Sequence, residues 1–459
     1  MALPDQVLSP LDGRYHATVS SLGEYLSEAG LNRARVHVEI EWLIALTTRE
    51  MFGSKPLSAT EVDSLRSFSR NFGQPEIDEL ATLEATTRHD VKAVEYLVRA
   101  QLQKLGLERI SELTHFACTS EDINNLSYAV TVRDAVTTTW LPAFDAVIAE
   151  LRTLALEHRA VPMLCRTHGQ PATPSTMGKE LAVFVYRLQR IRTQILATEY
   201  LGKFSGATGT FSAHVAADSS TDWPAVSREF VESLGLTWNP LTTQIESHDW
   251  QAELYSTIAH ANRVLHNLAT DIWTYISLGY FRQIPQAGAT GSSTMPHKIN
   301  PIRFENAEAN LELSCALLDS LASTLVTSRL QRDLTDSTTQ RNIGVALGHS
   351  LLALDNIRRG LGEIDLDADA LARDLDANWE VLGEAIQTVI RAEVAAGRSS
   401  ISDPYALLKD LTRGKKLTAD GMREFIATLD VSDDAKTRLA ALSPAHYAGL
   451  ADALVSFID

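Results

Sequence analysis

Cysteine is scarce in this 459-residue sequence, which holds only Cys118, Cys165 and Cys315, none of them in a CxxC pattern. A disulfide framework or a cysteine-based zinc site is therefore not expected, and three scattered thiols fit a reducing compartment. A run of roughly 18 apolar residues is also missing, so we expect no membrane-spanning helix. The N-terminal segment lacks the basic stretch and apolar core of a secretory signal peptide. These absences predict a cytoplasmic protein that does not bind membranes.

Positive charge is in deficit, with 41 Lys and Arg residues against 58 Asp and Glu residues and a net charge of −17. No basic stripe stands out, so we do not expect a nucleic-acid partner. An anionic substrate would need a locally basic pocket. Glycine and proline, at 24 and 15 residues, fall below average usage, which leaves room for long uninterrupted helices.

Helical periodicity dominates what is present. Between residues 253 and 278 the apolar positions are spaced alternately by four and three, which predicts a long helix. They are Leu254, Ile258, Ala261, Leu265, Leu268, Ile272 and Tyr275. This stripe could serve either as the core of one chain or as a contact between subunits. Similar patterns predict helices from about Gly178, over 304–325, and over 122–158 with Pro142 as a kink or break.

Sustained strand-like alternation is nearly absent, so the predicted fold class is all-α. We expect three helical domains. Shorter helices predict an N-terminal domain over 1–112, and the long helices predict a central bundle over 113–364. Helices broken by glycine and proline predict a C-terminal domain over 365–459.

Several segments between the long helices mix Gly, Ser, Thr and His without helical periodicity, which is typical of functional loops. The strongest is residues 291–301, GSSTMPHKINP. Backbone amides of its Gly-Ser-Ser turn can bind an anion, Lys298 adds positive charge, and a serine there could act as a base. The alternative is an ordinary flexible loop between helices.

This segment resembles the signature loop of the fumarase/aspartase superfamily, GSSxMPxKxNP. Residues 119–125, TSEDINN, and 167–172, THGQPA, resemble the first two conserved regions of the same superfamily. Taken alone, the first is a helix N-cap and the second a turn with an ordinary histidine. The resemblance implies a central helical bundle, assembly as a homotetramer, and elimination of fumarate or a close relative from a succinyl-type substrate.

Within the superfamily, the sequence is similar to the bacterial, purine-biosynthetic adenylosuccinate lyases. His297 precedes the lysine of the signature, and PLDGRY at 10–15, RHDVK at 88–92 and RDLTDSTTQRN at 332–342 resemble segments of that family. Taken alone, the first segment could be a surface turn and the second a capped helix start with solvated charges. The arginines of the third could be helix-surface charges. Two alternatives remain: another superfamily lyase such as argininosuccinate lyase, and a non-catalytic structural protein on this scaffold, as the lens crystallins are.

The resemblance implies a carbon–nitrogen lyase that eliminates fumarate from adenylosuccinate, giving AMP, and from the succinylated ribotide SAICAR, giving AICAR. It implies Ser292, rather than Ser293, as general base and His168 as general acid. The implied substrate-binding residues are Arg14, Tyr15, Arg88, His89, Asp90, Thr119, Ser120, Gln244, Lys298, Asn300, Asn306, Arg332, Ser337 and Arg341.

We expect no metal and no cofactor, because His, Asp and Glu never cluster at zinc-ligand spacing and the elimination needs no Lewis acid. The three signature segments fall at the ends of different long helices. Consecutive antiparallel helices place alternate loops at opposite ends of a bundle. We therefore expect active sites shared between subunits of a homotetramer.

Overall fold

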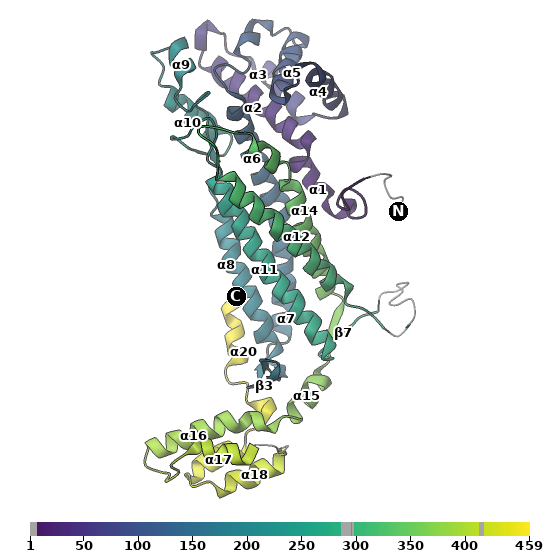
Figure 1. Cartoon of the computed structure of the whole chain (residues 1–459), viewed down its shortest axis with the longest axis vertical. Helices are drawn as coiled ribbons and strands as arrows, with labels where there is room; N and C mark the ends of the chain where they lie inside the picture. Colours follow the sequence, from purple (N-terminus) through teal and green to yellow (C-terminus); the bar gives the residue numbers. More distant parts are fainter. Residues whose placement is uncertain (1–6, 286–294, 296–297, 413–416) are drawn as a thin grey trace. The chain divides into compact units, whose positions relative to one another are not determined.

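The structure, a computed structural model, describes residues 7–285, 295, 298–412 and 417–459, and Figure 1 labels its elements. Helices dominate the described residues, and the strands among them are two or three residues long. The strands form four pairs: β1 (Pro162–Met163) with β4 (Ser175–Thr176), β2 (Arg166–Thr167) with β3 (Gln170–Pro171), β5 (Leu201–Gly202) with β6 (Thr237–Trp238), and β7 (Phe281–Gln283) with β8 (Ile364–Leu366). The β5–β6 pair is parallel and the others are antiparallel. The all-α expectation is confirmed.

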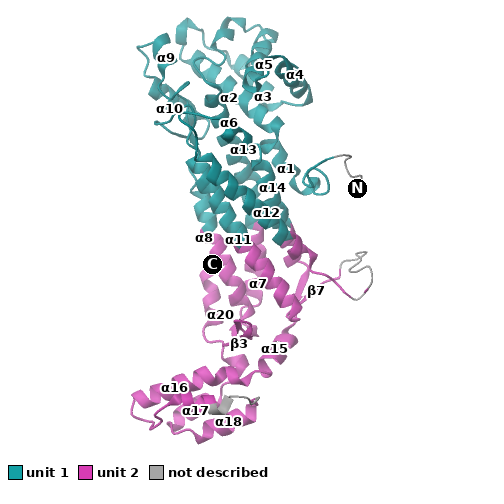
Figure 2. Ribbon diagram, in the orientation of Figure 1, with its two compact units in different colours: residues 1–145, 191–263, 307–355 teal, residues 146–190, 264–306, 356–459 magenta. Residues whose placement is uncertain are grey.

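The chain divides into two compact units, coloured separately in Figure 2. Unit 1 contains residues 1–145, 191–263 and 307–355, and unit 2 contains residues 146–190, 264–306 and 356–459. Five helices contribute residues to both units: α7 (Leu141–Glu157), α8 (Met177–Leu196), α11 (Asp249–Ser277), α12 (Ile302–Leu325) and α14 (Ile343–Leu361). The division into three domains at 112 and 364 stays a prediction.

The long helices lie where the apolar spacing predicts them, and α11 is the clearest case. Six of its seven stripe residues are buried within the single chain, from Leu254 at 1% exposure to Ile272 at 0%, and Tyr275 is half-buried. The stripe is therefore core within one chain. A subunit contact would have to use other faces of the long helices.

Pro142 interrupts regular α-helix as predicted. The helix α6 (Ser120–Ala135) passes into a π-helical turn at Val136–Trp140, and α7 starts directly after it at Leu141. Proline has no N–H to donate to the carbonyl one turn earlier, and its ring crowds that carbonyl. The wider π turn relieves this crowding, and α7 follows it without an intervening loop.

Unit 1 contains the N-terminal helices. They are α1 (His16–Leu26), α2 (Glu28–Thr48), α3 (Ala59–Arg70), α4 (Gln74–Thr87) and α5 (Asp90–Lys104), followed later by α9 (Ser212–Ala217), α10 (Trp223–Ser233) and α13 (Thr335–Gln340). The helix α2 packs against α1, α3, α5 and α6. A buried cluster that includes Val36, Leu43, Val94 and Leu97 fills the space between them.

A buried polar network joins the long helices inside unit 1. Asn262 donates to Ser314 Oγ at 3.0 Å and accepts from Ser350 Oγ at 2.8 Å, and Trp140 Nε1 donates to Ser350 Oγ at 2.8 Å. All four side chains are buried. Buried polar groups are costly unless they are paired. These bonds therefore favour the observed register of the helices over registers in which the groups would lose their partners.

Unit 2 ends in a small helical region with its own core. Its helices are α15 (Ala368–Asp376), α16 (Gly383–Ala395), α17 (Pro404–Thr412), α18 (Ala419–Thr428), α19 (Asp433–Ala440) and α20 (Ala451–Leu454). Trp379, Ile386, Met422 and Ile426 belong to one buried cluster there. Across the described part of the chain, no helix is both long and apolar enough to cross a membrane.

Candidate active site

The first signature segment forms the start of α6 in unit 1, as its capping pattern predicts. Thr119 is the N-cap, and its backbone N–H donates to Asp122 Oδ2 at 2.8 Å. Asp122 is fully buried and also accepts from the backbone N–H groups of Ser205 at 2.9 Å and Gly206 at 3.1 Å. The first turn of α6 is therefore held against the 202–214 segment, with the carboxylates of Glu121 and Asp122 at its positively polarised N-terminus.

Lys203 links this helix start to Gln244. Its Nζ lies 2.8 Å from Asp122 Oδ1, with both side chains 0% exposed. The same Nζ donates to the carbonyls of Gly206 at 2.9 Å and Gln244 at 2.8 Å. A fully buried ion pair is tolerated only when further hydrogen bonds satisfy both partners, and these bonds do so. Gln244 and Thr119 are thus positioned by one buried pair.

Three predicted residues lie around the short helix α13 in unit 1. Arg332 Nη1 is 2.7 Å from Glu121 Oε1, and its Nη2 is 3.7 Å from Asp336 Oδ1. Arg341 Nη1 donates to Ser337, at 3.0 Å to its Oγ and 3.1 Å to its carbonyl. Arg332, Ser337 and Arg341 are therefore fixed on one local framework.

Asp90 connects that framework to α5 and α2. Its Oδ2 lies 3.3 Å from Arg341 Nη2 and 2.8 Å from Arg35 Nη2. Arg35 Nε donates to Asn124 at 2.9 Å, and Asn124 donates to the same Glu121 oxygen that contacts Arg332. Burial opposes ionisation of Asp90, but the charges of Arg35 and Arg341 and hydrogen bonding lower its pKa. The network therefore stays charged at neutral pH.

Three further candidates of unit 1 lie at helix ends: Arg88 and His89 between α4 and α5, and Arg14 just before α1. His89 is the N-cap of α5, and its Nδ1 accepts from the backbone N–H of Lys92 at 3.2 Å. Arg88, just before it, has an exposed side chain and a left-handed backbone conformation, with φ of 52°. The Arg14 guanidinium lies 5.9 Å from the centre of the Tyr15 ring. His89, Arg88 and Arg14 are accessible to a ligand.

His168 lies at the exposed tip of a hairpin in unit 2. Thr167 in β2 pairs with Gln170 in β3, and the two residues between them, His168 and Gly169, have φ values of 54° and 74°. Two consecutive positive φ values are typical of the two-residue turn that matches strand twist. The glycine adopts this conformation freely, and histidine is among the side chains that tolerate it. The turn directs His168 into solvent.

The hairpin is anchored at its base by Arg166. Its Nη2 lies 2.6 Å from Asp374 Oδ2, and its Nη1 donates to Tyr280 Oη at 2.7 Å. Tyr280 in turn donates to Asp374. Burial and the neighbouring Asp374 raise the pKa of Tyr280 to about 12, so its hydroxyl remains a donor. Arg166, Tyr280 and Asp374 therefore hold β2, the strand that leads into the turn with His168.

The signature loop is described only in part. Ser292, Ser293 and His297 lie outside the described residues. Lys298 is exposed, and its backbone N–H donates to the carbonyl of Met295 at 3.0 Å. Asn300 is half-buried just before α12, and Asn306 is half-buried in its first turns. The roles proposed for these side chains stay predictions.

Sequence reasoning overlooked the charged residues that hold the candidates in place: Arg35, Glu121, Asp122, Lys203 and Arg166. Glu121 and Asp122 lie inside a motif already singled out, and Lys203 lies in the 202–214 segment. No pattern in the sequence marks Arg35, which is separated by 55 positions from Asp90 and by 89 from Asn124.

Two family models match the chain. The model described as Lyase matches residues 13–314, and the model described as Adenylosuccinate lyase C-terminal matches residues 328–448. Together, the two matched ranges include every candidate site residue that the structure describes. The first match alone extends over more than half of the sequence.

Relatives and solved structures agree with these matches. The chain is 47% identical to adenylosuccinate lyase of Escherichia coli strain K12, covering 98% of this chain and 97% of that protein. It is 46% identical to the enzyme of that name from Haemophilus influenzae, at the same coverage.

Two solved structures share the fold. A 3-carboxy-cis,cis-muconate lactonizing enzyme from Pseudomonas putida has a TM-score of 0.73 at 21% identity, covering 97% of both chains. A fumarate lyase from Mesorhizobium sp. BNC1 has a TM-score of 0.74 at 19% identity, covering 96% of this chain and 97% of that chain. The chain therefore belongs to the adenylosuccinate lyases, carbon–nitrogen lyases of the fumarase/aspartase superfamily.

Proposed function

We propose that this protein cleaves adenylosuccinate to AMP and fumarate. The observation that carries the proposal is the network around Asp90, which fixes Arg332 and Arg341 near the amide-bearing start of α6. Adenylosuccinate carries a phosphate and two carboxylates, and arginine forks suit both groups. The carboxylates of Glu28, Asp90, Glu121 and Asp336 hold these two guanidinium groups in place, so the N–H donors that remain on them are fixed for an anionic substrate.

The reaction is a β-elimination. A base removes a proton from the carbon next to a carboxylate, and the resulting carbanion is delocalised as an aci-carboxylate that fixed donors stabilise. The electron pair then forms the double bond of fumarate as the carbon–nitrogen bond breaks. An acid protonates the departing nitrogen, which stays on the nucleotide as the amino group of AMP.

We assign Ser292 as the base and His168 as the acid. His168 at the tip of its hairpin is free to approach a substrate nitrogen. Lys298, Asn300, Thr119 and Ser120 are proposed to bind the succinyl carboxylates. The remaining candidates are proposed to bind and orient the nucleotide part: Arg14, Tyr15, Arg88, His89, Asp90, Gln244, Asn306, Arg332, Ser337 and Arg341.

A second substrate is proposed on the same chemistry. SAICAR joins a succinyl group through nitrogen to an aminoimidazole ribotide, so the bond broken and the charges bound are of the same kind. The products would be AICAR and fumarate.

An absorbance assay tests the activity directly. Purified protein added to adenylosuccinate should abolish the absorbance band of the substrate, with fumarate and AMP appearing in equal amounts. Argininosuccinate, tested in parallel, should stay intact. Turnover of argininosuccinate alone would identify a different superfamily lyase. No turnover of adenylosuccinate, SAICAR or argininosuccinate would favour a structural protein on this scaffold.

We also propose a homotetramer whose active sites draw residues from different subunits. The candidates fall into both units of the chain: His168, Lys298, Asn300 and Asn306 in unit 2, and the other described ones in unit 1. The long helices also carry large apolar side chains that are exposed in the single chain, at 41% for Val183, 50% for Tyr186 and 53% for Leu313. Such side chains are candidates for subunit contacts.

Hybrid tetramers test the sharing of sites. His168→Ala and Ser292→Ala proteins should each be inactive, and mixing them after dissociation and reassembly should restore activity. Random assembly would restore at most roughly a quarter of the sites. Native mass measurement confirms that hybrids have formed. Confirmed hybrids without activity would mean that both residues come from one chain.

A cytoplasmic location is proposed as well. It is supported by the three cysteines, all free in the structure, which suit a reducing compartment. Cell fractionation followed by immunoblotting should recover the protein with a cytosolic marker, and recovery with a periplasmic marker would contradict the proposal.

A further inference from the structure

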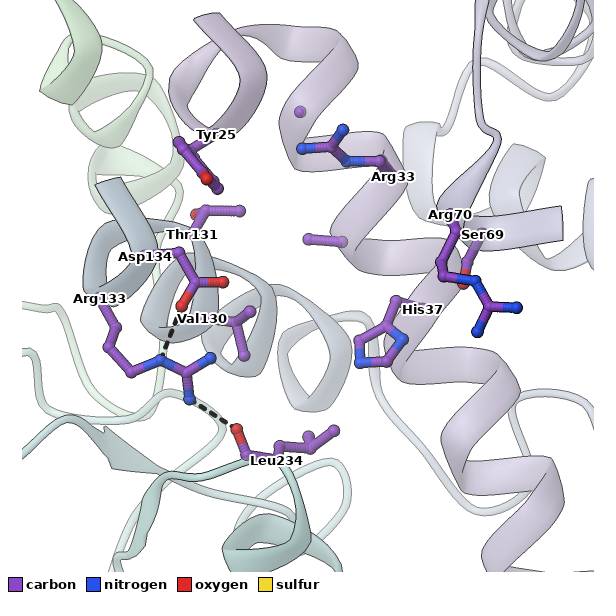
Figure 3. A pocket seen from close by; sticks show the side chains of 12 residues that line it. Tyr25, Arg33, His37, Ser69, Arg70, Val130, Thr131, Arg133, Asp134 and Leu234 are labelled. Carbon is purple, nitrogen blue, oxygen red and sulfur yellow. Dashed lines mark hydrogen bonds and ion pairs between the residues drawn. The ribbon is translucent and has the colours of Figure 1, made fainter. Parts of the chain in front are cut away.

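A cavity of about 340 Å³ in unit 1 lies outside every candidate discussed so far. Its lining comes from the end of α1, from α2, α3 and α6, and from Leu234 (Figure 3). None of its lining residues belongs to the proposed substrate site. Its volume is within the range of small-molecule sites in proteins.

The lining carries a surplus of positive charge. Arg33, Arg70 and Arg133 contribute three cations, and Asp134 contributes one carboxylate. Burial lowers the pKa of His37, with Glu41 acting in the opposite direction, so this side chain adds no charge at neutral pH. In a chain of net charge −17, a cavity with three arginines marks a local preference for anions.

The arginines keep hydrogen-bond donors free for a ligand. Arg33 donates to the carbonyl of Glu24, and Arg70 donates to Asp63 Oδ1 at 3.0 Å. A guanidinium has more N–H groups than one such bond uses. The other donors of both side chains have no protein acceptor among the described residues. In Figure 3 the Arg33 and Arg133 side chains approach the cavity from opposite sides.

Arg133 is held in place before any ligand binds. Its Nε donates to Asp134 at 2.8 Å, and its Nη1 donates to the carbonyls of Leu234 at 2.6 Å and Gly235 at 3.2 Å. Gly235 has φ of +73°, and a Cβ there would lie 2.8 Å from Arg133 Nη1. The glycine therefore permits both the turn and the close approach of the guanidinium. Its Nη2 donors remain for a ligand.

We infer that this cavity binds an organic phosphate, with the phosphate bound by the free donors of Arg33 and Arg133 and the organic part against Tyr25. Two guanidinium groups with unused N–H donors in the wall of one cavity suit the several acceptor oxygens of a phosphate. Inorganic phosphate would leave most of the cavity unfilled, whereas the Tyr25 ring in its wall offers apolar surface to a larger ligand. The site is independent of the reaction proposed above.

Calorimetric titration of the intact protein with ribose 5-phosphate tests the inference. Arg33→Gln and Arg133→Gln should each raise its Kd by roughly 10-fold to 100-fold, as expected for a lost charge-assisted hydrogen bond. Arg423→Gln, which removes an exposed arginine far along the chain in α18, is the charge-matched control and should leave the Kd unchanged. Ribose should not bind, and inorganic phosphate should bind more weakly than ribose 5-phosphate.

Arg341→Gln separates this site from the substrate site, because it alters the latter and leaves the cavity intact. A thermal unfolding midpoint close to the native value shows that each variant is folded. If Arg133→Gln does not fold, Arg33→Gln decides, since the Arg33 side chain donates to a single backbone carbonyl, that of Glu24. Native-like binding by Arg33→Gln, or loss of all binding in Arg341→Gln, would overturn the inference. Equal affinity for inorganic phosphate would overturn the organic part of it.

Discussion

Arg341 and Asp90 are 251 positions apart in the sequence, yet Nη2 of the arginine lies 3.3 Å from Oδ2 of the aspartate. The pair joins the end of α13 to the start of α5. Because Arg35 shares the same carboxylate oxygen, one side chain positions two arginines. The site therefore depends on Asp90 even where Asp90 itself does not touch substrate.

Replacing Asp90 by Asn should weaken substrate binding. The amide keeps the shape of the carboxylate but loses its charge, so Arg341 keeps only its ion pair with Glu28, which lies 3.4 Å from its Nε. We expect KM for adenylosuccinate to rise by roughly 10-fold, in line with a lost charge-assisted contact. Steady-state kinetics measure this. Asp434→Asn, which breaks the exposed Arg438 pair in α19, is the matched control, and an unchanged KM in Asp90→Asn would argue against a positioning role.

Lys203→Met should be strongly destabilising. It leaves the buried Asp122 carboxylate without its ion-pair partner and frees the carbonyls of Gly206 and Gln244. Breaking a buried pair on one side costs about 3–5 kcal/mol. Urea unfolding measures the loss. Lys104→Met removes an exposed pair with Glu79 at 3.5 Å and should cost less than about 1 kcal/mol; similar losses in both variants would contradict this prediction.

His168→Ala and Ser292→Ala should each lower kcat by roughly 10²–10⁴-fold, the usual span for acid–base groups. Nucleotide binding should persist in both, because neither side chain is a proposed phosphate ligand. Activity assays and AMP binding measure the two properties separately. If Ser293→Ala were inactive while Ser292→Ala stayed near native activity, the base would be Ser293.

Asp374→Asn should lower kcat while changing KM little. The substitution weakens the ion pair that holds Arg166, and with it the hairpin that carries His168. Small displacements of an acid–base group cost roughly 10-fold to 100-fold in rate. Asp365→Asn, which loses only an exposed contact with Arg282 at 3.5 Å, is the control. A drop in stability without any change in kcat would assign the Arg166–Asp374 pair a purely structural role.

The pair formed by His115 and Glu39 should make stability depend on pH. Burial lowers the pKa of His115, but the hydrogen bond and charge of the fully buried Glu39, 2.6 Å away, outweigh burial and raise it. A raised folded-state pKa contributes stability that is fully present below the unfolded value of about 6.5 and is lost as pH rises through the folded value. Thermal midpoints of native and His115→Gln protein should therefore differ most near pH 6 and converge at higher pH. A gap that widened with pH would show the opposite sign.

Much of the architecture follows from local sequence. The alternate spacing of four and three from Leu254 to Tyr275 specifies one helix, α11, because a helix brings such positions onto one face. Pro142 specifies the break after α6, because its ring and missing N–H act on the preceding turn wherever the chain goes. The Thr119 cap and the His168–Gly169 turn are likewise local features, since each depends on neighbouring residues. The signature segments also sufficed to indicate the family.

Tertiary structure alone decided which charges meet. Lys203 is paired with Asp122, and Arg35 with Asp90, across gaps that no sequence spacing encodes. It also decided that the α11 stripe is core within one chain, a choice that spacing left open. The physical reason is the same in both cases. Periodicity shows which face of a helix is apolar, but the partner of a buried charge or face is chosen by the whole packing, where an unpaired charge would be too costly to keep.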